Sequence, residues 1–590
     1  ASGFDTDRLP MPHPPLLARL SLACLCSALV LPFLIPHHFN PIPSFIQEWT
    51  AAMFGLLAAC VLTHRHLIED IEIPEIALIP LGLIGLLLLQ YFTGLAQSIT
   101  QALLAALYLL WSLLMLTAAS NLRRVVRPET IARCAAIAIL FGAVFSAAIQ
   151  ALQFAGYGFG SGLISPLARG SSNLGQPNHL ADYLWLGIAS ALFLHAEKRI
   201  GWPLFIATAT GLATSSTLTG SRSTLLYAFG LTVLSLWSAW RFKTPALRRT
   251  AVAAAAILAL TVLLQFALAH SEVATTINAS LSGERLFREA GTPSQRLQLW
   301  RTGLAIFADH PWLGAGIGHF PYASYITAAN QPGIYLGGGE HAHNLIIQLL
   351  SEFGILATLF VCVLVWRWWR AFIRTEWTAM QWWVAALLLV IGTHSQLEYP
   401  LWYVFFLGIA SLALGLGSQA GMHPEISRHG RWVILLGLSL GAMTLASLIV
   451  DYRHLENTLY ARTVNDTGQP ASSRTRLDAL ARLHRESLLA HYVPLSYAHQ
   501  IEVNREALPD KITVCEMAIR FSPVDLVTFK LAWLLALDDR KADARSALHR
   551  AIATHPAYAT TAAKELDQLI KQFPEISWLK TELSRLMQRN

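Results

Sequence analysis

Thirteen long apolar stretches between Leu16 and Val450 constrain this chain more than any other feature. A helix that crosses a membrane needs roughly 20 apolar residues, because in lipid each backbone polar group must be satisfied within the protein. The predicted spans cover residues 16–35, 45–63, 76–93, 99–120, 131–155, 180–196, 202–219, 223–240, 250–269, 344–366, 379–397, 401–418 and 431–450. The sequence therefore predicts an all-α protein, a polytopic membrane helical bundle of about 13 transmembrane helices.

The composition changes after residue 450. Over the whole chain only 13% of residues are charged, against about 25% in soluble domains. Residues 451–590, by contrast, have ordinary soluble composition, with nineteen Lys and Arg against seventeen Asp and Glu. We therefore expect a membrane domain over residues 11–450 and a soluble domain over residues 451–590. Residues 1–10 precede Met11, look like a remnant of cloning, and are set aside.

Positive charge fixes the predicted orientation, because Lys and Arg in short loops stay on the cytoplasmic side. With a cytoplasmic N-terminus, the inner loops hold fifteen such residues: Arg65, Arg123, Arg124, Arg127, Lys198, Arg199, Arg241, Lys243, Arg248, Arg249, Arg367, Arg370, Arg374, Arg428 and Arg431. The outer loops hold six: Arg169, Arg222, Arg285, Arg288, Arg296 and Arg301. The large loop 270–343 and residues 451–590 are then periplasmic, and the protein lies in the inner membrane of a Gram-negative cell. This placement of charge accounts for the net charge of +7 without nucleic acid as a partner.

Three polar clusters lie on the predicted outer side. The first, residues 175–179, precedes the sixth span and contains Gln176 and Asn178. The second covers residues 295–300 and 310–320 and ends at 340–344, and the third, residues 394–403, joins the eleventh and twelfth spans. The glycines at 314, 316 and 318 indicate a tight turn, since no strand–helix unit surrounds them.

His343 is the candidate general base. An apolar helix is predicted from about Asn344, and an imidazole in its first turn would feel the positive end of the helix dipole, which disfavours the cation. A neutral imidazole can take a proton from a hydroxyl. His341 lies two residues earlier, and spacing alone does not decide between the two histidines. The alternative is a pair of hydrogen-bonded interfacial histidines.

The outer arginines suit phosphate, because a guanidinium is always charged and binds phosphate oxygens with two donors. Arg222 lies at a helix junction at the membrane edge, where an ionisable residue is a functional candidate, although it could also be a snorkelling anchor. Gln176 and Asn178 could bind sugar or phosphate, or cap the following helix. A metal site from Glu340, His341, His343 and His394 is the rival chemistry, but no zinc-ligand spacing is present.

These motifs resemble those of the bacterial superfamily of O-antigen ligases, O-antigen polymerases and PglL-type protein O-oligosaccharyltransferases. The matching segments are QPNHLADY at 176–183, GSR at 220–222, RLQLWRTGLAIFADHPWLGAGIGHF at 296–320, HAHN at 341–344 and HSQLEYPLWY at 394–403. The last two are most similar to the protein-glycosylating branch. The resemblance extends over the whole predicted membrane domain, which it identifies as the catalytic domain.

The resemblance implies an inverting, metal-independent glycosyltransferase without a cofactor. Its donor would be an undecaprenyl-pyrophosphate-linked oligosaccharide, transferred en bloc to a Ser or Thr of a pilin or another periplasmic protein. The family's functional histidine corresponds to His343 and its arginines to Arg222 and Arg296, while Tyr399 and Tyr403 correspond to tyrosines implicated in that branch. We expect the remaining polar residues of the three clusters to bind substrate: Gln176, Asn178, His341, His394 and Glu398.

The soluble domain shows one recognisable helical-hairpin repeat of the tetratricopeptide (TPR-like) type. Ala544, Leu548, Ala551 and Pro556 match the late positions of that 34-residue repeat, with Leu531 and Leu535 earlier. Its balanced charge favours binding of protein over binding of lipid.

Two alternative functions remain open. The first is the same chemistry on lipopolysaccharide, as an O-antigen ligase or polymerase. The second is a transporter of lipid-linked glycan, whose fold would be expected to show an internal repeat and polar residues at the membrane midplane. The polar clusters of this chain lie at one face instead, which weighs against transport.

Overall fold

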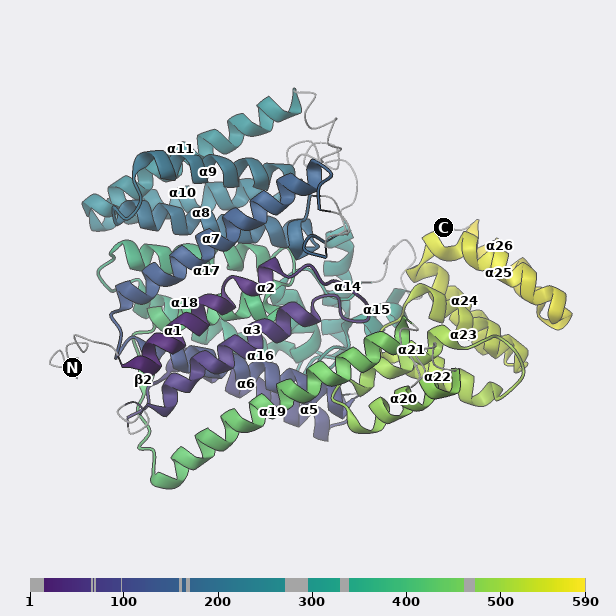
Figure 1. Ribbon diagram of the computed structural model, residues 1–590. Helices are drawn as coiled ribbons and strands as arrows, with labels where there is room; N and C mark the ends of the chain where they lie inside the picture. The colour runs from purple at the N-terminus through teal and green to yellow at the C-terminus, as the bar shows by residue number, and fades with distance from the viewer. Residues whose placement is uncertain are drawn as a thin grey trace. The chain divides into compact units, whose positions relative to one another are not determined.

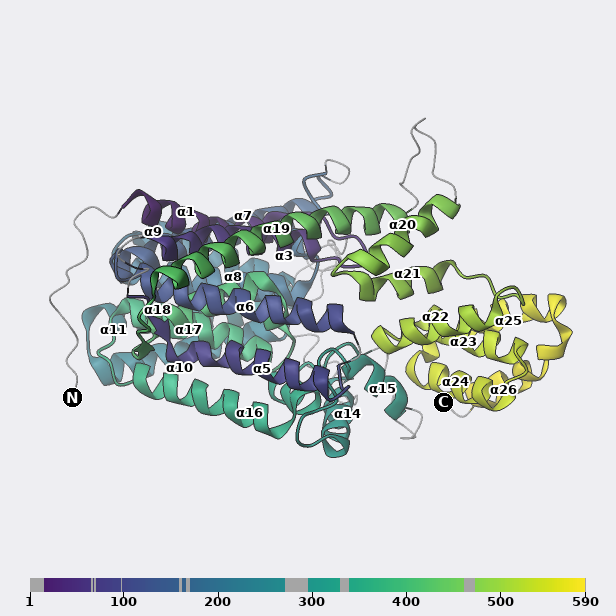
Figure 2. The same cartoon turned by 90° about the horizontal axis from the view of Figure 1, so that it is seen from below.

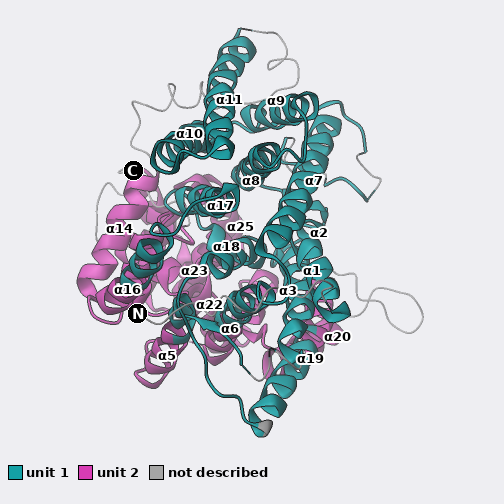
Figure 3. Cartoon of the chain, turned by 90° about the vertical axis from the view of Figure 1, so that its left-hand side faces the viewer, with its two compact units in different colours: residues 1–81, 108–292, 362–445 teal, residues 82–107, 293–361, 446–590 magenta. Residues whose placement is uncertain are grey.

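The computed structural model describes residues 15–64, 67, 70–96, 98–158, 162–165, 170–270, 295–328, 339–460 and 473–588. Residues 1–10, Arg65, Arg169, Arg285, Arg288 and most of 270–294 fall outside these ranges. The chain forms two compact units (Figure 3). Unit 1 comprises Ala1–Leu81, Tyr108–Thr292 and Cys362–Leu445, and unit 2 comprises Gly82–Leu107, Pro293–Val361 and Ala446–Asn590.

Each predicted span contains a helix. The helices are α1 (Leu16–Ala28), α2 (Leu31–Leu34), α3 (Phe45–Ala59), α5 (Leu78–Phe92), α6 (Ile99–Leu122), α7 (Pro128–Phe154), α8 (Pro177–Ala196), α9 (Trp202–Leu218), α10 (Ser223–Phe242), α11 (Pro245–Ala269), α16 (Leu345–Phe372), α17 (Ala379–Ser395), α18 (Val404–Gly417) and α19 (Arg428–Leu459). Within the described ranges, nine helical segments are long and apolar enough to cross a membrane, and α17 and α18 are apolar but shorter. The chain is thus an all-α, multi-pass membrane protein, and the number of thirteen spans stays a prediction.

Helix α8 is the centre of unit 1. Every residue from His179 to Ala196 is buried, because α8 packs against α7, α9, α10 and α17 (Figure 1). A helix enclosed by protein can carry polar groups that a lipid-facing helix cannot. Asp182, Ser190 and His195 of α8 are all buried.

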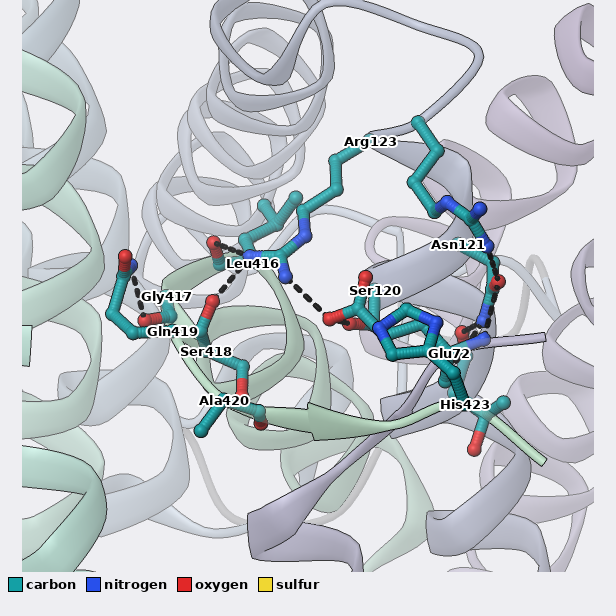
Figure 4. A network of polar contacts seen from close by, with 12 residues as sticks. Glu72, Ser120, Asn121, Arg123, Leu416, Gly417, Ser418, Gln419, Ala420 and His423 are labelled. Carbon is teal, nitrogen blue, oxygen red and sulfur yellow. Dashed lines mark hydrogen bonds and ion pairs between the residues drawn. The ribbon is translucent and has the colours of Figure 1, made fainter. Parts of the chain in front are cut away.

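A polar network joins three chain segments of unit 1 (Figure 4). The Arg123 guanidinium donates to Glu72 Oε1 at 2.5 Å and to the Ser418 carbonyl, and Ser120 Oγ donates to the same Glu72 oxygen at 2.8 Å. Asn121 exchanges two hydrogen bonds with the backbone of Glu72. Next to it, β1 (Ile73–Pro74) pairs antiparallel with β2 (Gly421–Met422). The network therefore fastens the end of α6 to the segment that follows α18.

We expect Glu72→Gln to lower the free energy of unfolding by about 2 kcal/mol, because the amide oxygen can still accept hydrogen bonds but no longer carries the charge that pairs with Arg123 in a largely buried place. Glu75→Gln is the matched control. The Glu75 carboxylate pairs with Arg367, whose side chain is 61% exposed, and an exposed pair contributes less than about 1 kcal/mol. Thermal unfolding of both variants in detergent tests this, and equal shifts in Tm would contradict the assigned role of the network.

Unit 2 contains the glycine-rich turn. Gly314, Gly316 and Gly318 have φ of 70°, 104° and 65°, as a tight turn of this kind requires. A Cβ at Gly314 would lie 2.2 Å from the backbone of Glu352, so the turn packs directly against α16. Gln90 holds the two together, since its side-chain nitrogen donates to the Leu313 and Glu352 carbonyls at 2.8 Å. Helix α16 is itself broken at Gly354, where φ is 74° and ψ −175°.

The C-terminal residues of unit 2 form α20 (Ser473–Glu486), α21 (Val493–Gln500), α22 (Leu508–Phe521), α23 (Asp525–Leu537), α24 (Lys541–Thr554), α25 (Ala559–Gln572) and α26 (Trp578–Met587). Helices α22, α23 and α24 lie side by side (Figure 2). Leu531 and Leu535 on α23 and Ala544, Leu548 and Ala551 on α24 are buried, as packed helical hairpins require. Assignment to the TPR type stays a prediction.

The C-terminal helices share their core with the 295–328 segment. That segment forms α14 (Gln295–Asp309) and α15 (Phe320–Ala328). Tyr325 of α15 is 2% exposed and belongs to the same apolar cluster as Ile512 and Leu548, with Tyr322 and Ile326 packed against it. Half of the predicted outer loop is therefore part of the same compact unit as the C-terminal domain.

Candidate functional site

The first and third polar clusters meet in unit 1. Asn178, in the first turn of α8, donates from Nδ2 to Glu398 Oε1 at 2.9 Å, although the two residues are 220 positions apart. Glu398 is 6% exposed and its backbone N–H bonds the His394 carbonyl at 2.8 Å. Tyr399 and Tyr403 stack with ring centroids 5.8 Å apart. Five predicted site residues, Asn178 on α8 and His394, Glu398, Tyr399 and Tyr403 in the 394–403 segment, thus come from two segments that the fold places in contact.

Gln176 is the N-cap of α8, and its side-chain oxygen accepts from the His179 backbone N–H at 2.7 Å. The capping role that the sequence left open is therefore present for Gln176. The cap fixes the start of α8, so that Asn178 and His179 face the 394–403 segment. His179 packs edge-on against Tyr403 with centroids 4.7 Å apart, and its ring lies 5.9 Å from that of His394.

Behind these residues lies a buried cluster that our sequence analysis did not identify. The Tyr227 hydroxyl hydrogen-bonds His394 Nδ1 at 2.7 Å, and the Asp182 carboxyl lies within interaction range of Tyr227. All three side chains are fully buried. Asp182 could have been found, because an acidic residue inside a predicted span is a functional candidate. Tyr227 gave no such signal.

Arg222 is the N-cap residue of α10 and is partly buried. Tyr227 follows five residues later on the same helix, so their backbones are separated by roughly 7–8 Å along the axis. Contacts between α10 and α17 join this helix to His394. The predicted arginine and the third cluster therefore lie in one region of unit 1. The network around Glu72 lies at the opposite end of the 14-residue helix α18, about 20 Å away.

The second polar cluster lies in unit 2. Arg296, in the first turn of α14, is partly buried, and Leu299 one turn later is buried in a cluster with Phe320 and Ala342. Ala342 separates His341 from His343, and its backbone N–H donates to Gln348 Oε1 at 2.6 Å. The apolar cluster therefore holds Arg296 and both histidines around the same small core.

The structure corrects the expected position of His343. Helix α16 begins at Leu345, and Asn344 caps it by accepting from the Ile346 and Ile347 backbone N–H groups at 3.1 Å each. His343 therefore precedes the helix instead of lying in its first turn. Its φ of 50° is left-handed, which is unusual for a residue with a Cβ and typical of functional positions.

Glu340 is the charged neighbour of this segment. Burial raises the pKa of the Glu340 carboxyl above its ordinary value, and the nearby His343 acts in the opposite direction. Among the residues described in both units, no three His, Cys, Asp or Glu side chains are grouped closely enough to hold a metal ion.

Three family models match the chain in successive segments. Residues 173–195 match "Protein glycosylation ligase", residues 204–362 match "O-Antigen ligase", and residues 382–569 match "Virulence factor membrane-bound polymerase, C-terminal". The general O-oligosaccharyltransferase of Acinetobacter baylyi is 27% identical over 457 residues, which are 74% of this chain and 76% of that protein.

These matches contain all three polar clusters and the helices that carry them. The chain is a multi-pass membrane enzyme that transfers glycosyl groups, and it is similar to the O-antigen ligase superfamily. Within that superfamily its similarity is to the PglL-type protein O-oligosaccharyltransferases.

Proposed function

We propose that this enzyme moves an oligosaccharide en bloc from undecaprenyl pyrophosphate to a Ser or Thr hydroxyl of a pilin or another periplasmic protein. The similarity to a general O-oligosaccharyltransferase over 74% of the chain carries this proposal. The reaction takes place on the outer side of the inner membrane, as the distribution of Lys and Arg indicates.

His343 acts as the base in this proposal. It takes the proton of the acceptor hydroxyl as the oxygen bonds to the anomeric carbon. The oxygen attacks opposite the leaving pyrophosphate, so the anomeric configuration inverts. The left-handed backbone of His343 and the buried Ala342 beside it support a fixed position for the imidazole.

Arg222 and Arg296 bind the pyrophosphate. Negative charge grows on the leaving phosphate oxygen as the glycosidic bond breaks, and a guanidinium stabilises that charge without proton transfer. No metal ion is needed in this scheme.

The remaining polar residues bind and position the substrates. The stacked rings of Tyr399 and Tyr403 offer an apolar face with hydroxyl groups, which suits a sugar. Asn178 and Glu398 form a fixed pair of hydrogen-bonding groups, and His341, His394 and Gln176 complete this set. The C-terminal helices bind the acceptor protein.

The orientation has its own test. A cysteine introduced at the exposed Ala557, in the short 3₁₀ helix Pro556–Tyr558 after α24, should react with an impermeant reagent in spheroplasts. Protection of this cysteine in intact spheroplasts, with labelling after lysis, would contradict the topology.

The function is tested with the purified chain, a defined undecaprenyl-pyrophosphate-linked glycan, and either a pilin or a lipopolysaccharide core as acceptor. Mass spectrometry should show one intact glycan added to the pilin, with the same rate in EDTA. Modification of the lipopolysaccharide core alone would overturn the protein-glycosylation proposal in favour of a ligase. Loss of activity in EDTA that one specific ion restores would contradict the metal-independent scheme.

A further inference from the structure

A cavity of about 500 Å³ lies between α7 and α9 in unit 1. It is lined by the second half of α7 and by α9 from Ala207 to its end, with the small residues Ala147, Ala151, Ala207 and Gly211 among the lining. Its volume falls in the range of small-molecule binding sites. We propose that this cavity binds the isoprenoid chain of the lipid-linked donor, an inference that rests on the proposed function.

The cavity exists because small side chains line it. Ala147 and Ala151 of α7 face Ala207 and Gly211 of α9, and a Cβ added at Gly211 would meet no atom within 4 Å. The two helices contact each other and α8 (Figures 1 and 3). The cavity is an open groove on the side of this bundle, since Ala151, Ala207 and Gly211 are exposed. The methyl branches of an isoprenoid chain make it broader than a straight acyl chain, and such a chain needs a groove free of large side chains.

Three of the four polar side chains that line the cavity, those of Gln150, Thr208 and Ser215, are already hydrogen-bonded to protein. Ser215 Oγ donates to Gln150 Oε1 at 2.5 Å, and Gln150 Nε2 donates to the Gly170 carbonyl at 2.9 Å. Thr208 Oγ1 donates to the Leu204 carbonyl of its own helix at 2.9 Å. These residues therefore present their carbon atoms to an occupant, as an apolar chain requires.

The position of the cavity identifies which apolar chain fits. Helix α9 ends at Leu218, which lines the cavity, and Arg222 follows four residues later after a turn at Gly220, where φ is 70°. Four residues span at most about 14 Å between Cα atoms. An apolar cavity whose end is only four residues from an arginine suits a ligand with an anionic head group and an apolar tail. A polyprenyl pyrophosphate has this form, and its pyrophosphate is the group assigned to Arg222.

Binding in this cavity should determine which lipid-linked ligands the enzyme prefers, and it should contribute less to the overall partitioning of a ligand between membrane and protein. Lipid tails are as apolar as an isoprenoid, so the gain comes from close packing and not from exclusion of water. A side chain that fills the cavity should therefore weaken long-chain ligands and leave short-chain ligands unchanged.

The test compares Gly211→Leu with the parent chain in detergent. The probes are undecaprenyl pyrophosphate without glycan and geranyl pyrophosphate, whose chain is too short to extend along the cavity. We expect the Kd for undecaprenyl pyrophosphate to rise about tenfold and the Kd for geranyl pyrophosphate to stay within twofold of its parent value. A tenfold rise in Kd corresponds to a modest loss of packing between the ligand and the cavity. Gly437→Leu on α19 is the matched control, because its added Cβ also meets no atom within 4 Å, and it should change neither value.

Three results would overturn the assignment. If Gly211→Leu weakened the binding of both ligands equally, the substitution would act on binding of the pyrophosphate head group and not of the isoprenoid chain. An unchanged Kd for the long-chain ligand would remove the cavity as its site. Loss of a co-purified phospholipid in Gly211→Leu, with the long-chain Kd unchanged, would assign the cavity to membrane lipid. Since both probes lack glycan, these results do not depend on whether the enzyme glycosylates protein.

Discussion

Replacing His343 with asparagine is expected to slow glycan transfer by about 10²- to 10⁴-fold while donor affinity stays nearly unchanged. The imidazole is assigned to the acceptor hydroxyl and is not required to touch phosphate. Asparagine is the better replacement than alanine, because the φ of 50° at this position is one that asparagine tolerates and alanine does not. Loss of the base can then be separated from loss of the local fold.

Arg222→Ala should fail in a different way. Its guanidinium is assigned to the pyrophosphate, which is charged in the bound donor and gains charge as the bond breaks. Both donor affinity and turnover should therefore fall. Arg222→Lys should recover only part of each, because a point charge cannot bind two phosphate oxygens as the planar guanidinium does.

The measurement is donor Kd beside single-turnover transfer rate for each variant, with thermal unfolding as the check on folding. His341→Asn is the control that decides between the two histidines. If it removes turnover while His343→Asn does not, the base is His341. If His343→Asn abolishes donor binding and Arg222→Ala leaves it intact, the two roles are reversed.

The sequence predicted helices well because lipid imposes a simple rule. A spanning segment must be long, apolar and helical, so each predicted range contains a helix. The rule is weaker for helices enclosed by protein. Helix α8 is such a case, since its neighbours allow it to carry Asp182 and His195 in its interior.

The sequence also predicted where the polar residues at the turns between spans would lie. Gln176, Asn178, Arg222 and Tyr403 each lie at or next to a helix end on the predicted outer side. Their pairing was not predictable, because the contact between Asn178 and Glu398 depends on how α8 packs against the segment after α17. The same holds for the Glu72 network and for the core that α15 shares with α22 and α24.

The position of His343 shows how local sequence can mislead. The apolar run that begins near Asn344 suggested a helix that includes His343 in its first turn. Asn344 instead caps the start of that helix with its own side chain, and His343 adopts a left-handed conformation before it. A side chain that caps a helix excludes the preceding residue from the helix.

Tyr227→Phe should slow glycan transfer by about 10- to 100-fold. This is the largest effect that we expect from a residue that the sequence motifs did not indicate. Tyr227 holds His394 through the 2.7 Å contact to Nδ1, and His394 lies beside His179, whose ring packs on Tyr403. Phenylalanine keeps the ring and removes the hydroxyl, so a buried imidazole nitrogen loses its partner at about 1–3 kcal/mol. His394 would then be free to turn and disturb the rings that are proposed to hold the glycan.

Tyr227 is a positioning residue in this account, so its variant should raise KM for the donor glycan and leave affinity for undecaprenyl pyrophosphate unchanged. His394→Asn should give the same pattern, and the double variant should be little worse than either single one, because both remove the same contact. Tyr183→Phe is the matched control: its hydroxyl is equally buried but donates to the Leu29 carbonyl at 2.8 Å, among residues not assigned to the site. It should lower stability by about 1 kcal/mol and leave KM unchanged. If the effects of Tyr227→Phe and His394→Asn on KM simply add, the two side chains act independently. If Tyr227→Phe and Tyr183→Phe change KM equally, the buried cluster contributes only to folding.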